Sequence, residues 1–222
     1  MFKLLCNALA RLLAGMLIIY VLLSVTAGTT DFPAGLLFMG ILFVPMLLVG
    51  IYLFVNDPEL LKKRLSSGEK EDTQKWVVAL SGIMFLSSFV LAGLDFRFSW
   101  FQLPRTVTYI AAGVFLIGYA LYFVVMKQNT YLSRTVEVQE HQQVISTGLY
   151  GVVRHPMYFA TVIMFLSMPI VLGSVIALIP MLIYPFLLVA RIKNEEKVLE
   201  EGLEGYKEYE KKVKYRLIPF IW

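Results

Sequence analysis

Four apolar runs, each about as long as a lipid bilayer is thick, constrain this chain more than any other feature of its sequence. A helix needs roughly 20 apolar residues to cross a hydrocarbon core of about 30 Å. The chain has 222 residues, and with 58% of them hydrophobic and 16% charged it is too apolar for an ordinary water-soluble domain. We therefore predict an all-α integral membrane protein. The four predicted spans are Leu12–Ala27, Ala34–Val55, Trp76–Leu94 and Val107–Met126.

A fifth apolar run, Tyr158–Ala190, has 33 residues and is interrupted by several prolines and a glycine. It is too long for one comfortable span and too short for two, so we predict a tight C-terminal transmembrane helical hairpin that bends near Pro169–Ser174. The polar tail 193–216 carries apolar and aromatic residues at helical spacing. It predicts amphipathic cytoplasmic helices interrupted near Gly202–Gly205.

The N-terminus allows a second interpretation, because Lys3 and Arg11 precede an apolar stretch that ends in small residues, as in a secretory signal peptide. That stretch is long, its A-G-T-T end matches a cleavage site only loosely, and another apolar run follows almost at once. A first transmembrane helix is the favoured interpretation. The single cysteine, Cys6, cannot form an intrachain disulfide, and with two distant histidines it predicts no metal site. We expect neither a metal nor a nucleic acid as a partner.

The distribution of lysine and arginine predicts how the chain is oriented. If the N-terminus lies inside, the outer loops 28–33 and 95–106 carry only Arg97 and Arg105 of the 20 lysines and arginines, which leaves the other 18 on the cytoplasmic side. The N-terminus, the loop 57–75, the connector 127–157 and the tail would then all be cytoplasmic.

The chain divides into a four-span membrane region, 1–126, and a second region, 127–222, that holds nearly all of the unusual polar residues. The mixed charges of the loop 57–75 are typical of a solvated connection and indicate no site. The polar residues of the second region that lie near the predicted membrane surface are Asn129, Arg134, His141, Gln142, Arg154, His155, Arg191, Asn194, Glu195 and Glu196.

The segment GLYGVVRHPMYFA, 148–160, places two polar side chains directly before a predicted helix. Proline favours the first helical position and keeps the preceding residue extended, so Pro156 should open the helix and His155 should precede it. The amides of Met157–Phe159, together with Arg154, would then form an anion site. An arginine at the membrane surface beside a capping turn explains the same segment equally well.

The segment Arg191-Ile-Lys-Asn-Glu195-Glu196 follows the hairpin. Arg191 and Glu195 are one helical turn apart and could form a surface pair. Glu196 points elsewhere on such a helix, which would leave its carboxylate free for a ligand. Because Arg191 lies where the apolar run ends, its charge either reaches out toward water or serves a site.

Several separated motifs occur in one order: G-L-Y-x-x-x-R-H-P-x-Y at 148–158, R-x-x-x-E-E-x-x-L at 191–199, G-Y-x-x-Y at 205–209 and I-P-F at 218–220. With the apolar hairpin between the first two, they resemble the isoprenylcysteine carboxyl methyltransferase family of integral membrane methyltransferases. The resemblance covers about 127–222. It implies an S-adenosylmethionine pocket built from the connector, hairpin and tail, with a lipophilic small-molecule or prenylated substrate entering from membrane lipid.

The resemblance also implies roles for individual residues. Arg191 and Glu196 match the pair expected near the reacting carboxylate and are the candidate catalytic residues. The candidate cofactor-binding residues, which include Arg154 from the anion-site argument, are His141, Gly148, Tyr150, Arg154, His155, Pro156, Tyr158, Glu195 and Glu196.

We expect methyl transfer to a carboxylate, which would need no general base, because sulfonium and carboxylate neutralise each other and an apolar site favours that loss of charge. Three alternatives stay open. A phospholipid or amine N-methyltransferase would need a base such as Glu196 or a histidine. The segment K-Y-R-L-I-P, 214–219, also resembles the end of membrane sterol reductases, which use NADPH. A transporter or scaffold would leave the polar cluster unexplained.

Overall fold

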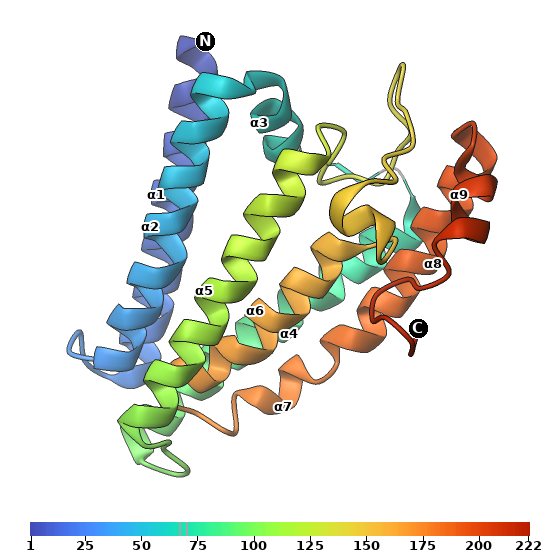
Figure 1. Cartoon of the computed structure of the whole chain (residues 1–222). Coiled ribbons are helices and arrows are strands. Elements are labelled where there is room, and N and C mark those ends of the chain that lie inside the picture. Colours follow the sequence, from blue (N-terminus) through green and yellow to red (C-terminus); the bar gives the residue numbers. More distant parts are fainter. Residues whose placement is uncertain (67, 70) are drawn as a thin grey trace.

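The protein is a bundle of four long helices with a shorter helical hairpin packed against it (Figure 1). The computed structural model describes residues 1–66, 68–69 and 71–222. The four long helices are each long and apolar enough to cross a membrane, which confirms the predicted all-α membrane architecture. They are α1 (Phe2–Ala27), α2 (Pro33–Asn56), α4 (Asp72–Phe98) and α5 (Arg105–Gln128).

The remaining helices are either short or part of the C-terminal hairpin. The described residues form no β-strand, and their one isolated β-bridge joins Gln102 and Ser174. These helices are α3 (Pro58–Leu65), the 3-10 turn η1 (Gly148–Gly151), α6 (Pro156–Val171), α7 (Leu178–Met181), α8 (Tyr184–Gly202) and α9 (Tyr206–Lys212).

Local sequence signals set several helix ends. Gly28 ends α1 in the left-handed region, with φ of 71°, where a residue without a side chain is favoured. Pro33 opens α2 and Pro58 opens α3, where their missing N–H groups cost nothing. Asp57 caps α3, since its Oδ1 accepts a hydrogen bond from Leu60 N at 3.0 Å.

Close helix contacts depend on two glycines. A Cβ on Gly118 of α5 would lie 2.8 Å from Met164 Cγ of α6, and a Cβ on Gly93 of α4 would lie 1.9 Å from Thr26 Oγ1 of α1. Small residues let membrane helices approach closely enough for dispersion contacts to hold them together, because lipid gives little hydrophobic driving force between helices. These contacts place α6 along α5 and α1 along α4.

The predicted hairpin is confirmed, with its bend between the end of α6 at Val171 and the start of α7. Ser174 Oγ in the bend donates a hydrogen bond to Asp95 Oδ2 of α4, and Asp95 Oδ1 accepts from Phe101 N at 2.8 Å. Asp95 is fully buried, so these partners satisfy a carboxylate that would otherwise be costly there. The hairpin returns through α8, which leaves the apolar region after Ala190 and continues as a polar helix to Gly202.

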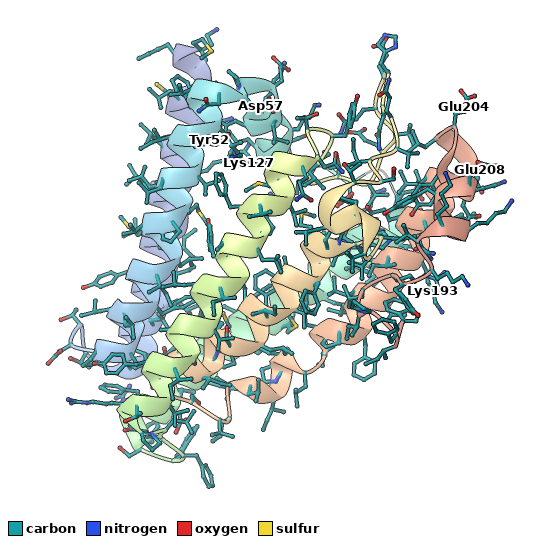
Figure 2. All side chains as sticks on the ribbon, in the orientation of Figure 1. Tyr52, Asp57, Lys127, Lys193, Glu204 and Glu208 are labelled. Atoms are coloured by element: carbon teal, nitrogen blue, oxygen red, sulfur yellow. The ribbon has the colours of Figure 1, made fainter. Side chains whose placement is uncertain are left out.

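Polar segments gather at one end of the bundle, which we call the polar end. The N-terminus, α3, the connector between α5 and α6, and α9 lie there, while the 28–32 and 99–104 connections lie at the other end (Figure 1). Figure 2 shows Tyr52, Asp57 and Lys127 at the polar end of α2 and α5, and the Lys127 ammonium lies 5.7 Å from the Tyr52 ring centroid. The segments predicted to share one side of the membrane therefore lie together.

We expect the polar end to face the cytoplasm, because it carries most of the lysines and arginines. In a Cys6→Ala background, a membrane-impermeant maleimide applied to intact cells should label Thr30→Cys and should not label Ser66→Cys or Glu208→Cys. Permeabilised cells should show labelling of all three. External labelling of Ser66→Cys or Glu208→Cys would overturn the predicted topology.

Candidate functional site

A cleft opens at the polar end between the connector, the first turn of α6, and α8 and α9. Of the predicted site residues, it brings together six in its wall. These are Tyr150, Arg154, His155, Tyr158, Arg191 and Glu195. The charged side chains Lys193, Glu204 and Glu208 lie on the outer side of the α8–α9 region (Figure 2).

The start of α6 is built as the sequence predicts, with Pro156 at its first turn and an extended His155 as the N-cap. The prediction that the amides of Met157–Phe159 stay open for an anion is wrong for Tyr158 and Phe159. Tyr158 N and Phe159 N donate to His155 O at 3.1 and 3.3 Å. The amides of Arg154 and His155 donate to the C-terminal segment, to Tyr215 O at 2.9 Å and Arg216 O at 2.8 Å. The turn therefore anchors the tail, because the amides of Arg154 and His155 bond carbonyl groups of the C-terminal segment.

Glu196 is the centre of a buried ionic cluster. Its Oε1 accepts from Arg154 Nη2 at 2.7 Å and Nε at 2.8 Å, and its Oε2 accepts from Arg216 Nε at 2.6 Å. His155 Nε2 lies 3.3 Å from the same Oε1. The Glu196 side chain is only 3% exposed. The expectation of a free Glu196 carboxylate is therefore wrong, because two guanidinium groups occupy it.

The cluster shifts the ionisation of Glu196. Burial by itself raises the pKa of this carboxyl group, but the hydrogen bonds and positive charges of His155, Arg216 and Arg154 outweigh it and lower the pKa from 4.5 to about 2. Glu196 is thus a carboxylate at neutral pH. A group this acidic is a poor general base.

Glu195, which lines the cleft, belongs to a second chain of contacts. Tyr158 donates its hydroxyl proton to Glu195 Oε2 and accepts a hydrogen bond from Arg191 Nε at 2.9 Å. The His155 ring stacks on the Tyr158 ring, with centroids 5.6 Å apart. The predicted contact between Arg191 and Glu195 thus runs through a tyrosine of α6, which couples the orientation of all three side chains.

Arg191 also has partners that the sequence did not reveal. Its Nη2 donates to Arg134 O at 2.9 Å, and its Nη1 lies 3.3 Å from Glu69 Oε1. The expectation that the loop 57–75 takes no part in a site is therefore wrong for Glu69. No periodicity or motif distinguishes this glutamate among the mixed charges around it, so the sequence carried no signal for it. The sequence analysis included Arg216 only as part of the K-Y-R-L-I-P segment and did not predict its contact with Glu196.

Besides Glu196, three predicted residues lie outside the cleft wall. Gly148 has φ of +60°, and a Cβ there would lie 2.7 Å from Gln128 Cδ, so it supports the turn behind the cleft. Pro156 is buried at the start of α6. His141 lies on the connector with its side chain 91% exposed, 3.7 Å from the neighbouring Glu140 carboxylate. The structure does not bring His141 to the other predicted residues.

The cleft has the surfaces needed to hold an organic ligand. Five tyrosines contribute to its wall, and one of them, Tyr206, is only 4% exposed. The Tyr206 hydroxyl has no hydrogen-bond partner within the described parts of the chain. A buried hydroxyl without a partner is costly, so a polar ligand atom in the cleft would stabilise it. The other tyrosines of the wall are Tyr131, which belongs to the connector, and Tyr150, Tyr158 and Tyr209.

The fold and the cleft define an all-α integral membrane protein with a polar, aromatic site where the bundle meets water. Residues 110–201 match the model of the isoprenylcysteine carboxyl methyltransferase (ICMT) family, which confirms the family resemblance of the motifs over this region. The match begins within α5, earlier than the predicted boundary at 127, and it ends at 201, so the tail motifs at 205–209 and 218–220 lie outside it. The early start agrees with the close packing of α5 on α6.

A second comparison links the chain to a reductase. It is 33% identical over 91 residues to the mouse (Mus musculus) protein Delta(14)-sterol reductase TM7SF2. The matched region is 40% of this chain and 22% of the relative. The chain therefore spans only about a fifth of the length of that relative.

We expect Glu196→Gln to lower the free energy of unfolding of the purified protein by about 3–5 kcal/mol, because it leaves two buried guanidinium groups without a negative partner. Glu195→Gln is the matched control. It keeps a hydrogen-bond acceptor for Tyr158 and should lower the free energy of unfolding by no more than about 1 kcal/mol. Thermal unfolding in detergent measures both.

The pH dependence of the protein's stability gives a second test of the Glu196 cluster. Because the folded pKa of Glu196 is lowered, its stabilisation is complete above the unfolded pKa of 4.5 and is lost as pH falls toward about 2. Glu196→Gln should remove that part of the acid destabilisation. Equal stability of the two glutamine variants across this range would contradict the structural role of the cluster.

Proposed function

We propose that this protein is a membrane methyltransferase that transfers a methyl group from S-adenosylmethionine to a carboxylate of a lipid-like or prenylated substrate at the cytoplasmic face. The observation that carries the proposal is the position of Arg191. It is held by Tyr158 in the wall of the cleft, at the point where α8 changes from apolar to polar, within the region that matches the ICMT family.

The residues of the cleft fit this cofactor. An adenine ring suits the tyrosine faces, and the unpartnered Tyr206 hydroxyl can bond a polar atom of the ligand. The Glu195 carboxylate can accept hydrogen bonds from an ammonium group or ribose hydroxyls. His155, stacked on Tyr158, completes this part of the wall.

Bound S-adenosylmethionine would supply a methyl group on a positively charged sulfur. The protein then has to hold a carboxylate in line with it. A guanidinium binds a carboxylate with directed hydrogen bonds, so we assign Arg191 to the substrate carboxylate. Tyr158 and Glu195 fix the Arg191 side chain, and the apolar first part of α8 suits the lipid part of the substrate.

The structure changes the role that we give to Glu196. Its carboxylate is occupied by Arg154 and Arg216, so we propose that it positions His155 and the tail instead of touching the substrate. The amine alternative depended on a base such as Glu196 or a histidine, and a pKa of about 2 makes Glu196 unsuitable for that role. A carboxylate acceptor needs no base.

The reductase alternative is supported by the similarity to the mouse sterol reductase. The two functions require different cofactors, so ligand binding separates them. We expect the purified protein to bind S-adenosylhomocysteine in the micromolar range, about −8 kcal/mol, and to bind NADPH far more weakly. His155→Ala should weaken S-adenosylhomocysteine binding by at least about 10-fold, or about 1.4 kcal/mol.

Isothermal titration in detergent measures both ligands, and Thr30→Ala at the opposite end of the bundle is the control. With labelled methyl donor and lipid extract, the product should be a methyl ester that is released by mild base. Tight NADPH binding without S-adenosylhomocysteine binding would replace the methyltransferase by the reductase.

We expect Arg191→Lys to slow methyl transfer by about 100-fold, because lysine cannot reproduce a guanidinium fork and the nucleophile would be misplaced. S-adenosylhomocysteine affinity should stay within about 3-fold of wild type, a change below about 0.7 kcal/mol. Arg97→Lys, at the other end of the bundle, is the matched control and should keep full activity.

Two results would change the assignment. Wild-type turnover in Arg191→Lys would remove Arg191 from the substrate site. A loss of S-adenosylhomocysteine binding as large as the loss of turnover would move Arg191 to the cofactor.

A further inference from the structure

Each nitrogen of the Arg191 guanidinium has a partner within the protein itself. Its Nε donates to Tyr158 Oη, its Nη2 to Arg134 O, and its Nη1 lies 3.3 Å from the Glu69 carboxylate. Tyr158 and the Arg134 carbonyl are neutral. Of these three partners, Glu69 is the one that carries a full negative charge.

Glu69 is held in this position by both carboxylate oxygens. Oε1 pairs with Arg191, and Oε2 accepts from Val136 N of the connector at 3.1 Å. Its side chain is 8% exposed and that of Arg191 is 14% exposed, so the pair is largely removed from water. Salt screens a partly buried ion pair less than it screens charges at the surface.

A substrate carboxylate that bridges the two terminal nitrogens of Arg191 would meet Glu69 at Nη1, while the Nε–H already donates to Tyr158. Resting on the proposed function, we propose that Glu69 is an internal competitor for the substrate carboxylate. It neutralises Arg191 in the empty protein, it is displaced by the acid, and it pairs with Arg191 again after the methyl ester has formed.

The charge balance of the reaction gives this exchange a direction. The bond between methyl carbon and sulfur breaks, the bond between methyl carbon and carboxylate oxygen forms, and no proton is released. The substrate changes from an anion to a neutral ester, while Arg191 and Glu69 keep their charges. An ester oxygen is a weaker partner for a guanidinium than the Glu69 carboxylate, so Glu69 favours release of the product over retention.

Glu69 would thus be a residue that sets the preference between acid and ester through Arg191. A competitor of this kind lowers the apparent affinity for the acid, because binding has to break an existing ion pair. Removing the charge of Glu69 should therefore tighten binding of the acid. A residue that only supports Arg191 would have the opposite effect, because its loss would loosen the arginine.

The test compares two ligands that differ only by the methyl group, N-acetyl-S-farnesylcysteine and its methyl ester. Both are titrated against the full-length protein in nanodiscs with S-adenosylhomocysteine present. We expect Glu69→Gln to bind the acid about 5- to 10-fold more tightly than wild type, the size of effect that a partly buried ion pair allows, and to change ester binding by less than about 2-fold.

Glu71→Gln, in the same loop but in contact with Asn194, is the matched control and should leave both affinities unchanged. Glu69→Ala should tighten acid binding in the same direction as Glu69→Gln, which guards against an effect of the glutamine amide. Unchanged or weaker acid binding in both Glu69 variants would overturn the competitor role and leave the proposed function standing. If wild type binds S-adenosylhomocysteine but not the acid, the proposed substrate class is wrong and the competitor role falls with it.

Discussion

The polar end of this protein depends on one buried carboxylate. Glu196 of α8 holds Arg154, which precedes α6, and Arg216, which follows α9, so a single side chain joins three segments that are distant in sequence. Burying these charges would be costly if any of them lacked a partner. The same contacts place His155 beside Glu195 and keep the tail against the first turn of α6.

The site also needs α8 in a fixed position, and the packing of the membrane-spanning helices provides it. Glycines at close contacts let α6 pack on α5, and the hairpin bend is tied to Asp95 of α4. Because α8 is continuous from the hairpin to Gly202, it carries Arg191 from apolar surroundings into the wall of the cleft. A lipophilic molecule with an anionic end suits such a boundary, since one helix offers both environments.

Much of the architecture could be predicted, because each prediction depended on residues close together in sequence. The lengths of the apolar runs predicted the four spans, the positions of proline and glycine predicted the hairpin bend, and Pro156 predicted the start of α6. The site was predicted less completely. Adjacent glutamates on a helix point about 100° apart, so the spacing separated Glu195 from Glu196 but could not say which one faces the cleft.

The sequence by itself determined that the chain is a helical membrane protein, where its helices begin and bend, and which motifs carry polar chemistry. These properties follow from apolar length and local backbone preference. Only the tertiary structure decided which charges pair. Arg216 lies 20 positions from Glu196, and Glu69 lies 122 positions from Arg191. A partner at such separations is chosen by how the helices pack, because the interaction acts through space at a few ångströms and leaves no local pattern in the sequence.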